Sequence, residues 1–264
     1  MKLKIFLSLL LFSVISCTKT SVDDFSSTFP NSTSSNYFKR STSITVEVHY
    51  ESGAEPFVGD IAPSPMVGAP EPIWNIVEDN ILELISARTV LPSLAVPKTL
   101  TEMNILPDLN KTLWTANDAV ELYNDHHDLV STQTQAVFYI YFVKGNSTSG
   151  TSTIGFSVNT TPVIIIFKDV INAASMNDAV KKFVEQSTIV HELGHAFGLV
   201  NNGIPMVEDH QDIIHGAHTT NIDCVMYYQN EGTDIQTFYS NYFLTGNAVL
   251  WGPEVLADAA AFSD

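Results

Sequence analysis

One stretch of the sequence combines residue types that could bind a metal ion and activate water. Residues 191–203 read HELGHAFGLVNNG, so His191 and His195 stand four positions apart. On a helix this spacing places both imidazoles on one face, where they can reach a single ion. Glu192 follows the first histidine directly, and its carboxylate therefore points beside the metal, toward a bound water. Imidazole is a good zinc ligand, so the motif predicts a catalytic zinc site.

Such a zinc site needs a third protein ligand, and the residues alone leave its identity open. Where the motif usually offers a histidine, this chain has Asn201. The other downstream residues that could coordinate a metal are Asp209, His210, Asp212, His215 and His218. His210 and His218 are the two strongest candidates, the first because residues 209–212 are dense in coordinating groups.

The chain from His218 to Met226 resembles the corresponding region of the metzincin zinc peptidases, and of the archaemetzincins in particular. Their pattern continues HExxHxxGxx with His-Cys, four residues and Cys-x-Met. His218, Cys224 and Met226 fall on this frame when residues 201–217 are treated as an insertion. The insertion carries the third histidine downstream, and the resemblance covers residues 185–228.

The resemblance implies an activity and a role for each residue of the motif. His191, His195 and His218 would bind Zn²⁺, and Met226 would form a Met-turn beneath the metal. Glu192 would act as general base toward a zinc-activated water that attacks a peptide bond, and would then protonate the leaving amine. The implied activity is that of a zinc endopeptidase acting on a protein or peptide substrate.

Two further positions bear on this resemblance. Tyr228 lies two residues past Met226, where astacins and serralysins carry a tyrosine that reaches the zinc or the oxyanion. It is a second catalytic candidate, although an aromatic of the turn or core is the alternative. Thr219 replaces the first cysteine of the pattern, and no later CxxC follows. The structural zinc site of archaemetzincins is therefore not expected, and Cys224 is interpreted as a small buried hydrophobe.

The N-terminus is expected to direct export and membrane attachment. Residues 1–4 include two lysines, and residues 5–15 are almost wholly apolar, which suits an export signal. The next residues, ending at Cys17, resemble the lipobox of bacterial lipoproteins. By that resemblance residues 1–16 are a signal peptide and Cys17 carries a lipid that anchors the protein in the bacterial cell envelope, at the outer membrane, facing the periplasm or the surface. An ordinary secretory signal is the alternative.

Composition restricts the other possibilities. Residues 17–43 are rich in Ser, Thr and Asn and are expected to form a flexible tether. The 264 residues are 45% hydrophobic, which is enough for one core, and we expect residues 44–264 to form a single peptidase domain that acts as a monomer. The net charge of −17 argues against nucleic acid as a partner. With two cysteines, one of them Cys17, no disulfide framework is expected.

Hydropathy patterns indicate an α/β (α+β) fold with the metal motif on a long helix. The resemblance to metzincins implies a mixed twisted sheet, this helix as the active-site helix, and a small C-terminal subdomain. Strands are predicted at residues 44–50, 136–143, 153–158 and 162–167, and helices at residues 73–88, 116–130 and 179–200. Residues 44–200 would form the upper part of the domain, and residues 201–264 the lower part with the Met-turn. Residues 153–158 would form the sheet edge with which a peptide substrate pairs.

Three other histidines receive structural interpretations. His49 lies on the polar face of the first predicted strand and is expected to be solvated. His126 and His127 are neighbours near a predicted helix C-terminus. Adjacent side chains on a helix point in different directions, so we expect these two to be structural rather than to bind a metal.

Two alternatives to a peptidase use the same residues. A catalytically silent zinc-binding surface lipoprotein could act as a binding module, although the intact Glu192 weighs against it. A zinc hydrolase could instead cleave a non-peptide amide, such as a cell-wall cross-link, because a fold alone does not define the substrate.

Overall fold

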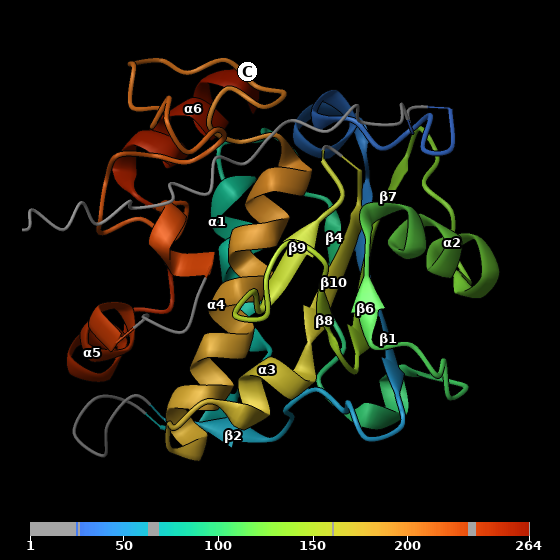
Figure 1. The fold of residues 1–264 in the computed structure, drawn as a ribbon. Helices are drawn as coiled ribbons and strands as arrows, with labels where there is room; N and C mark the ends of the chain where they lie inside the picture. Colours follow the sequence, from blue (N-terminus) through green and yellow to red (C-terminus); the bar gives the residue numbers. More distant parts are fainter. Residues whose placement is uncertain (1–24, 26, 63–68, 160, 232–235, 264) are drawn as a thin grey trace, which may run out of the picture.

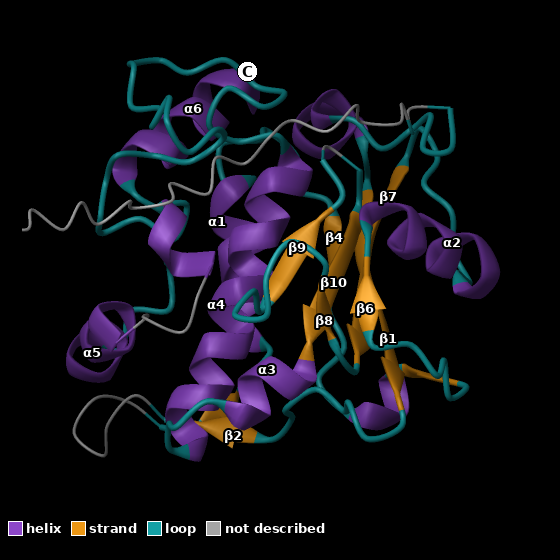
Figure 2. Ribbon diagram, in the orientation of Figure 1, coloured by secondary structure: helices purple, strands orange, loops and turns teal. Residues whose placement is uncertain are grey.

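A mixed six-stranded sheet forms the centre of the fold (Figures 1 and 2). The structure is a computed structural model, and it describes residues 25, 27–62, 69–159, 161–231 and 236–263. Across the sheet the strands are β4 (Ser93–Ala95), β1 (Ser43–Glu51), β7 (Gln135–Val143), β10 (Val163–Phe167) and β9 (Gly155–Ser157), and β5 (Asn104–Leu106) also pairs with β1. The β9–β10 pairing is antiparallel and the others are parallel. The predicted α/β class with a mixed sheet is thus confirmed.

Helices cover both faces of this sheet. The α-helices are α1 (Asn75–Leu84), α2 (Ala116–His126), α3 (Lys168–Ala173), α4 (Asp178–Phe197), α5 (Gln236–Thr245) and α6 (Pro253–Ser263). Shorter elements are η1 (Asn36–Arg40), η2 (Leu100–Glu102), η3 (Tyr228–Glu231) and the strand pairs β2 (Asp60–Ile61) with β3 (Glu71–Pro72) and β6 (Leu113–Trp114) with β8 (Asn146–Ser147). Figure 1 shows α1 and α4 on one side of the sheet and α2 on the other. Because both faces are covered, β7 and β10 are buried along almost their whole length.

The predicted strands and helices are present, with shifts at their ends. The four strands correspond to β1, β7, β9 and β10, and β9 lies at the sheet edge, as expected. The helices predicted at residues 73–88 and 116–130 correspond to α1 and α2, which end at residues 84 and 126. Extended backbone at His127 ends α2, and the His127 ring stacks on Tyr123 and donates from Nδ1 to the Tyr123 carbonyl oxygen (2.7 Å). His127 is therefore structural, as predicted.

The ends of α4, which carries the HELGH motif, follow from the residues beside them. At its start, Asn177 is the N-cap, and its Oδ1 accepts a hydrogen bond from the Val180 N–H (3.0 Å). At its end, Gly198 adopts a φ of 88°, a left-handed conformation that glycine adopts without strain. Ser34 Oγ donates to the Phe197 carbonyl oxygen (2.7 Å), which ties this end to the N-terminal segment. The helix predicted at residues 179–200 therefore stops three residues earlier, at Phe197.

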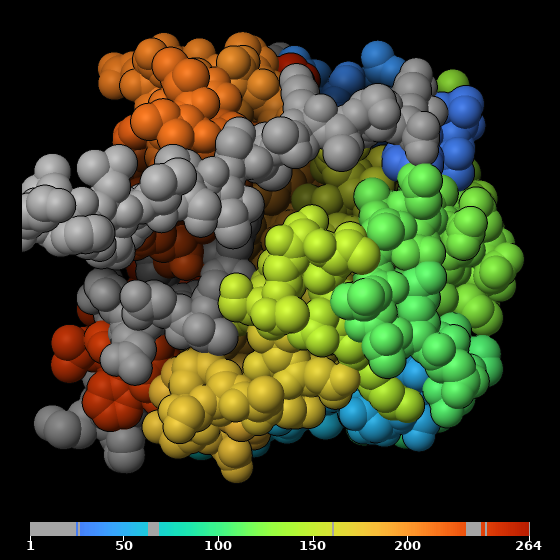
Figure 3. Space-filling model, viewed as in Figure 1, coloured from blue at the N-terminus to red at the C-terminus, as the bar shows by residue number. Residues whose placement is uncertain are grey.

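The chain after α4 gathers on one side of the molecule. In the space-filling view these residues, orange to red, lie together, whereas the yellow and green residues of the sheet and its connections lie beside them (Figure 3). Within this part, α5 packs against α4, and α6 packs against α1 and η1. The lower part of the domain therefore contacts elements from the first half of the chain as well as the metal-motif helix.

The prediction that residues 17–43 form a flexible tether is wrong for residues 27–43, which the structure describes. Tyr37 and Phe38 have no exposed surface, and the ring centroid of each lies 5.4 Å from that of Phe197. The Arg88 guanidinium donates to the Tyr37 carbonyl oxygen (2.9 Å). A few aromatic side chains thus bury a segment whose average composition is typical of a linker, because burial depends on apolar area rather than on composition.

The predictions about membrane attachment concern residues that the structure does not describe. The signal peptide at residues 1–16 and the lipidated Cys17 both lie outside the described residues. Within the described part of the chain, no helix combines the length and the apolar character that a membrane-spanning helix needs.

The prediction that His49 is solvated is also wrong. Only 2% of its surface is exposed, its ring stacks on Tyr141, and its Nε2 lies 2.6 Å from Glu47 Oε1. The Glu47 carboxylate also accepts the backbone N–H groups of Asp128 (2.8 Å) and Leu129 (2.9 Å). Alternating residues predict a solvated strand face only where one face of the sheet is open, and β1 is an interior strand with both faces covered.

Candidate metal centre

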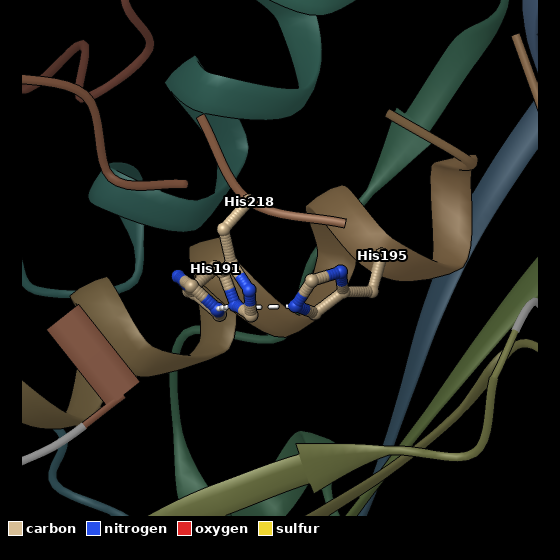
Figure 4. A group of neighbouring side chains, drawn as sticks. All are labelled: His191, His195 and His218. Atoms are coloured by element: carbon tan, nitrogen blue, oxygen red, sulfur yellow. Dashed lines mark hydrogen bonds between the residues drawn. The ribbon is translucent and has the colours of Figure 1, made fainter. Parts of the chain in front are cut away.

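Three histidines converge at the C-terminal half of α4. His191 and His195 project from one face of the helix, and His218 approaches from a separate segment of the chain (Figure 4). The Nε2 atom of His191 lies 3.1 Å from that of His195 and 3.2 Å from that of His218. All three potential ligand atoms lie within 4.8 Å of one another, so the group could hold a metal ion. Two nitrogens bound to one tetrahedral zinc lie about 3.3 Å apart, which agrees with these distances.

Backbone carbonyl groups orient two of the three rings. His191 Nδ1 lies 2.6 Å from the Val225 carbonyl oxygen, and His218 Nδ1 lies 2.6 Å from that of His215. A carbonyl oxygen only accepts hydrogen bonds, so each Nδ1 carries the proton and each Nε2 carries a lone pair. In neutral rings the Nε2 lone pairs of both histidines are therefore directed to the same buried place, where one cation can accept both. The arrangement fits a bound metal ion.

The structure brings His218, and not His210, to the histidine pair on α4. His210 Nε2 lies 2.8 Å from Asp258 Oδ2, and its Nδ1 lies 3.1 Å from Thr219 Oγ1. Asp258 Oδ1 also accepts the Val207 N–H (2.6 Å). His210 and Asp258 thus fasten the long loop at residues 198–218 to α6, and this fixes the approach of His218. His215 is exposed and does not join the histidine pair on α4.

The side chain of Glu192 connects α4 to the edge strand β9. Its side chain is buried, with 2% of the residue exposed, and Oε2 accepts the backbone N–H of Ser157 (2.7 Å). Glu192 directly follows the candidate ligand His191 on α4, and a main-chain donor of β9 holds its carboxylate in place. A carboxylate in this place can accept a proton from a water at the metal site.

Met226 packs against the helix between the two histidines of the motif. It has no exposed surface, and a Cβ atom at Gly194 would overlap its sulfur and lie 3.1 Å from the Trp251 ring. Glycine at position 194 is therefore required by this close packing. The Met226 carbonyl oxygen also accepts the Thr219 N–H (3.0 Å), next to His218. Met226 thus lies under the helix and beside the loop that brings the third histidine.

Cys224 and Tyr228 lie near the candidate ligands in different environments. Cys224 is buried, its Sγ accepts the Gly252 N–H (3.0 Å), and burial raises the pKa of its thiol to about 12. It is a small buried residue, as predicted. The Tyr228 ring stacks on His215 with centroids 3.6 Å apart, and its hydroxyl accepts a hydrogen bond from Gln229 Nε2 (3.0 Å). The catalytic role of Tyr228 stays a prediction.

Residues of α6 that support the site were missed by the sequence interpretation. Glu254 accepts hydrogen bonds from Thr219 Oγ1 (3.2 Å) and from Asn221 Nδ2 (2.9 Å). Asp258, four residues later, binds His210. The spacing of four is a usable signal, because it places two carboxylates on one helix face where they can accept hydrogen bonds from the same loop.

Comparisons with known proteins do not indicate a function for this chain. The chain matches no protein-family model, no curated protein and no solved structure. The function must therefore be argued from the histidine group, from Glu192 and from the elements that hold them, because chemistry belongs to sites rather than to folds.

Proposed function

We propose that this protein is a zinc-dependent endopeptidase of the metzincin type. The observation that carries the proposal is the convergence of His191, His195 and His218. Glu192 follows His191 directly on α4, and the Ser157 N–H fixes its carboxylate. Three protein ligands with one open position are typical of catalytic zinc, whereas structural zinc sites have four protein ligands. The candidate ligand group has three members among the described residues.

The chemistry of the donors favours zinc over calcium and magnesium. All three donors are imidazole nitrogens, whereas calcium and magnesium prefer oxygen ligands. Two of the rings donate to backbone carbonyl oxygens, which are common hydrogen-bond partners of zinc-bound histidines. A zinc ion bound there would supply Lewis acidity that makes water nucleophilic at neutral pH.

Glu192 would move the protons of the reaction. The Ser157 N–H fixes one carboxylate oxygen, so the side chain keeps one orientation and the other oxygen can take up a proton. In the proposed reaction Glu192 accepts a proton from the attacking water as the new C–O bond forms at the scissile carbonyl. It then gives this proton to the amine nitrogen as the C–N bond breaks.

The edge strand supports a peptide as the substrate. β9 is short, antiparallel to β10, and lies at the margin of the sheet directly beside α4. An extended peptide can add to such an edge through main-chain hydrogen bonds, which places its carbonyl groups along the strand. The anchor at Cys17 would hold the enzyme, as a monomer, in the bacterial cell envelope.

The test combines metal analysis with peptide cleavage. We expect the purified protein to contain about one zinc per chain, to cleave casein or a peptide library, and to lose cleavage when zinc is chelated. Glu192→Gln should keep its zinc but lower kcat/KM by about 100- to 10,000-fold, the usual contribution of a general base. Glu121→Gln, a change of the same charge at an exposed position of α2, should leave both unchanged. Zinc binding without cleavage by the wild type would instead identify a binding module.

A further inference from the structure

Asn80 is an unusual residue for its position. It lies inside α1 with no exposed surface, although asparagine is a poor residue for a helix interior and a buried amide is costly unless it is hydrogen-bonded. Its Nδ2 donates to the carbonyl oxygens of Ile76 (2.7 Å) and Ala248 (2.6 Å), and its Oδ1 accepts the Leu250 N–H (2.8 Å). The side-chain amide therefore binds residues 248–250 as a neighbouring strand would.

From this clamp a series of short contacts leads to the metal site. The Leu250 carbonyl oxygen accepts the Val225 N–H (2.8 Å). The Val225 carbonyl oxygen in turn faces His191 Nδ1 at 2.6 Å. The amide of Asn80, the peptide groups of Leu250 and Val225, and the imidazole of His191 thus form one continuous hydrogen-bonded series that is buried throughout.

A second contact from the same residue leads to the packing under α4. The Asn80 carbonyl oxygen accepts a hydrogen bond from Trp251 Nε1 (2.8 Å). The Trp251 ring packs at Gly194, where a Cβ atom would lie 3.1 Å from it, beside the Met226 sulfur. Asn80 therefore fixes the position of residues 248–251. This segment contacts Val225, which orients His191, and Gly194, which lies between His191 and His195 on α4.

We propose that Asn80 is a positioning residue that sets the orientation of His191 for metal binding. Removal of its amide would leave the Leu250 N–H and the Ala248 carbonyl without their partner in a buried place. The segment at residues 248–251 would then shift, and the Val225 carbonyl with it. Loss of a partner that orients a metal-ligating histidine lowers metal affinity by about 10- to 100-fold, and we expect about 10-fold for this more remote residue.

The experiment compares zinc affinity in matched variants by chelator competition. Asn80→Leu keeps the approximate volume and removes the amide, so its zinc Kd should rise about 10-fold. Asn80→Asp should retain more of the affinity, because burial favours a protonated carboxyl, which keeps the acceptor and one of the two donors of the amide. Asn36→Ala is the control, since Asn36 is 3% exposed and also binds two carbonyl oxygens, those of Asn31 and Thr132 (both 2.8 Å).

A second measurement reads the orientation of each ring directly. In NMR spectra of the zinc-free protein, the Nδ1–H resonance of His191 should shift in Asn80→Asp, while that of His218, bonded to His215, stays in place. Unchanged His191 resonances, or equal losses of zinc affinity in Asn80→Leu and Asn36→Ala, would overturn the inference. If Asn80→Leu does not fold, Asn80→Asp decides by the same two readings.

The inference rests on the metal site of the proposed function, and the two can fail separately. A wild type that binds no zinc defeats the proposed function, while the NMR reading in the zinc-free protein still tests the link from Asn80 to His191. A wild type that binds zinc and is indifferent to Asn80 defeats only the inference.

Discussion

Two places in this molecule bury histidine, and they use the ring nitrogens in opposite ways. On the α2 side of the sheet, His49 directs Nε2 to the Glu47 carboxylate at 2.6 Å and stacks on Tyr141. On the α4 side, His191 and His218 direct Nδ1 to backbone carbonyls and turn Nε2 toward each other. The first arrangement pairs the ring with a carboxylate of the same strand, whereas the second directs the Nε2 atoms of two rings to one place.

This difference shows that burial alone does not identify a metal ligand. In the α4 group, Nδ1 of His191 and of His218 faces a neutral carbonyl acceptor, and the Nε2 atoms of the three histidines converge. The two places also differ in their origin along the chain. Glu47 and His49 come from one strand, whereas the candidate ligands come from a helix and from a loop that α6 holds in place.

The largest expected effect is the loss of zinc when one member of the α4 group is removed. His218→Ala should weaken zinc binding by more than about 100-fold, because a lost ligand costs more than a lost orienting partner. His49→Gln should leave the zinc Kd unchanged, since its ring is satisfied by Glu47 and Tyr141. Chelator competition on both variants measures the contrast. Equal losses in the two variants would erase the distinction between the two places.

A smaller effect is expected from filling the contact under α4. Gly194→Ala would push its new methyl group into the Met226 sulfur and the Trp251 ring, so the free energy of unfolding should fall by about 1–3 kcal/mol. Gly150→Ala is the control, because a Cβ there would make only an ordinary contact of 3.4 Å with Thr153 Oγ1. Urea denaturation of the two variants measures the difference. A Gly194→Ala protein as stable as the wild type would argue against the close packing.

The smallest expected effect is a pH dependence that belongs to the α2 side. Burial would raise the pKa of Glu47, but the hydrogen bonds from His49 and from the N–H groups of Asp128 and Leu129 outweigh it and hold the pKa below its ordinary value. A lowered carboxyl pKa adds stability above the unfolded pKa, about 4.3 for glutamate, and this stability is lost as the pH falls through the folded pKa.

Glu47→Gln should therefore lower stability at neutral pH and reduce the loss of stability in acid. Urea midpoints measured between about pH 7 and pH 3 test this, because the range spans the titration of a glutamate. The zinc Kd at neutral pH should not change. An unaltered acid profile in Glu47→Gln would show that the carboxylate contributes nothing on this side of the sheet.

Local patterns predicted much of this fold because they reflect burial of single elements. Continuous apolar runs predicted β7 and β10, and helical spacing of apolar residues predicted α4. The structure contains all three elements. The approach of His218 followed from a resemblance, and no local pattern distinguished it from His210.

What the sequence did not reveal depends on contacts between distant segments. His49 alternates like an exposed residue, and only the position of β1 inside the sheet buries it. Tyr37 and Phe38 sit in a Ser- and Thr-rich stretch, and they are buried because α4 and the sheet offer them apolar surface. The clamp between Asn80 and residues 248–250 spans about 170 positions of the chain, beyond the reach of any local pattern.

The most direct test of the central claim is X-ray absorption at the zinc edge of the purified wild-type protein. We predict one tightly bound zinc ion with three imidazole nitrogens at about 2.0–2.1 Å and a light fourth ligand. Coordination by fewer than three imidazoles, or a protein that retains no zinc after dialysis, would contradict the assignment of His191, His195 and His218 as a metal centre.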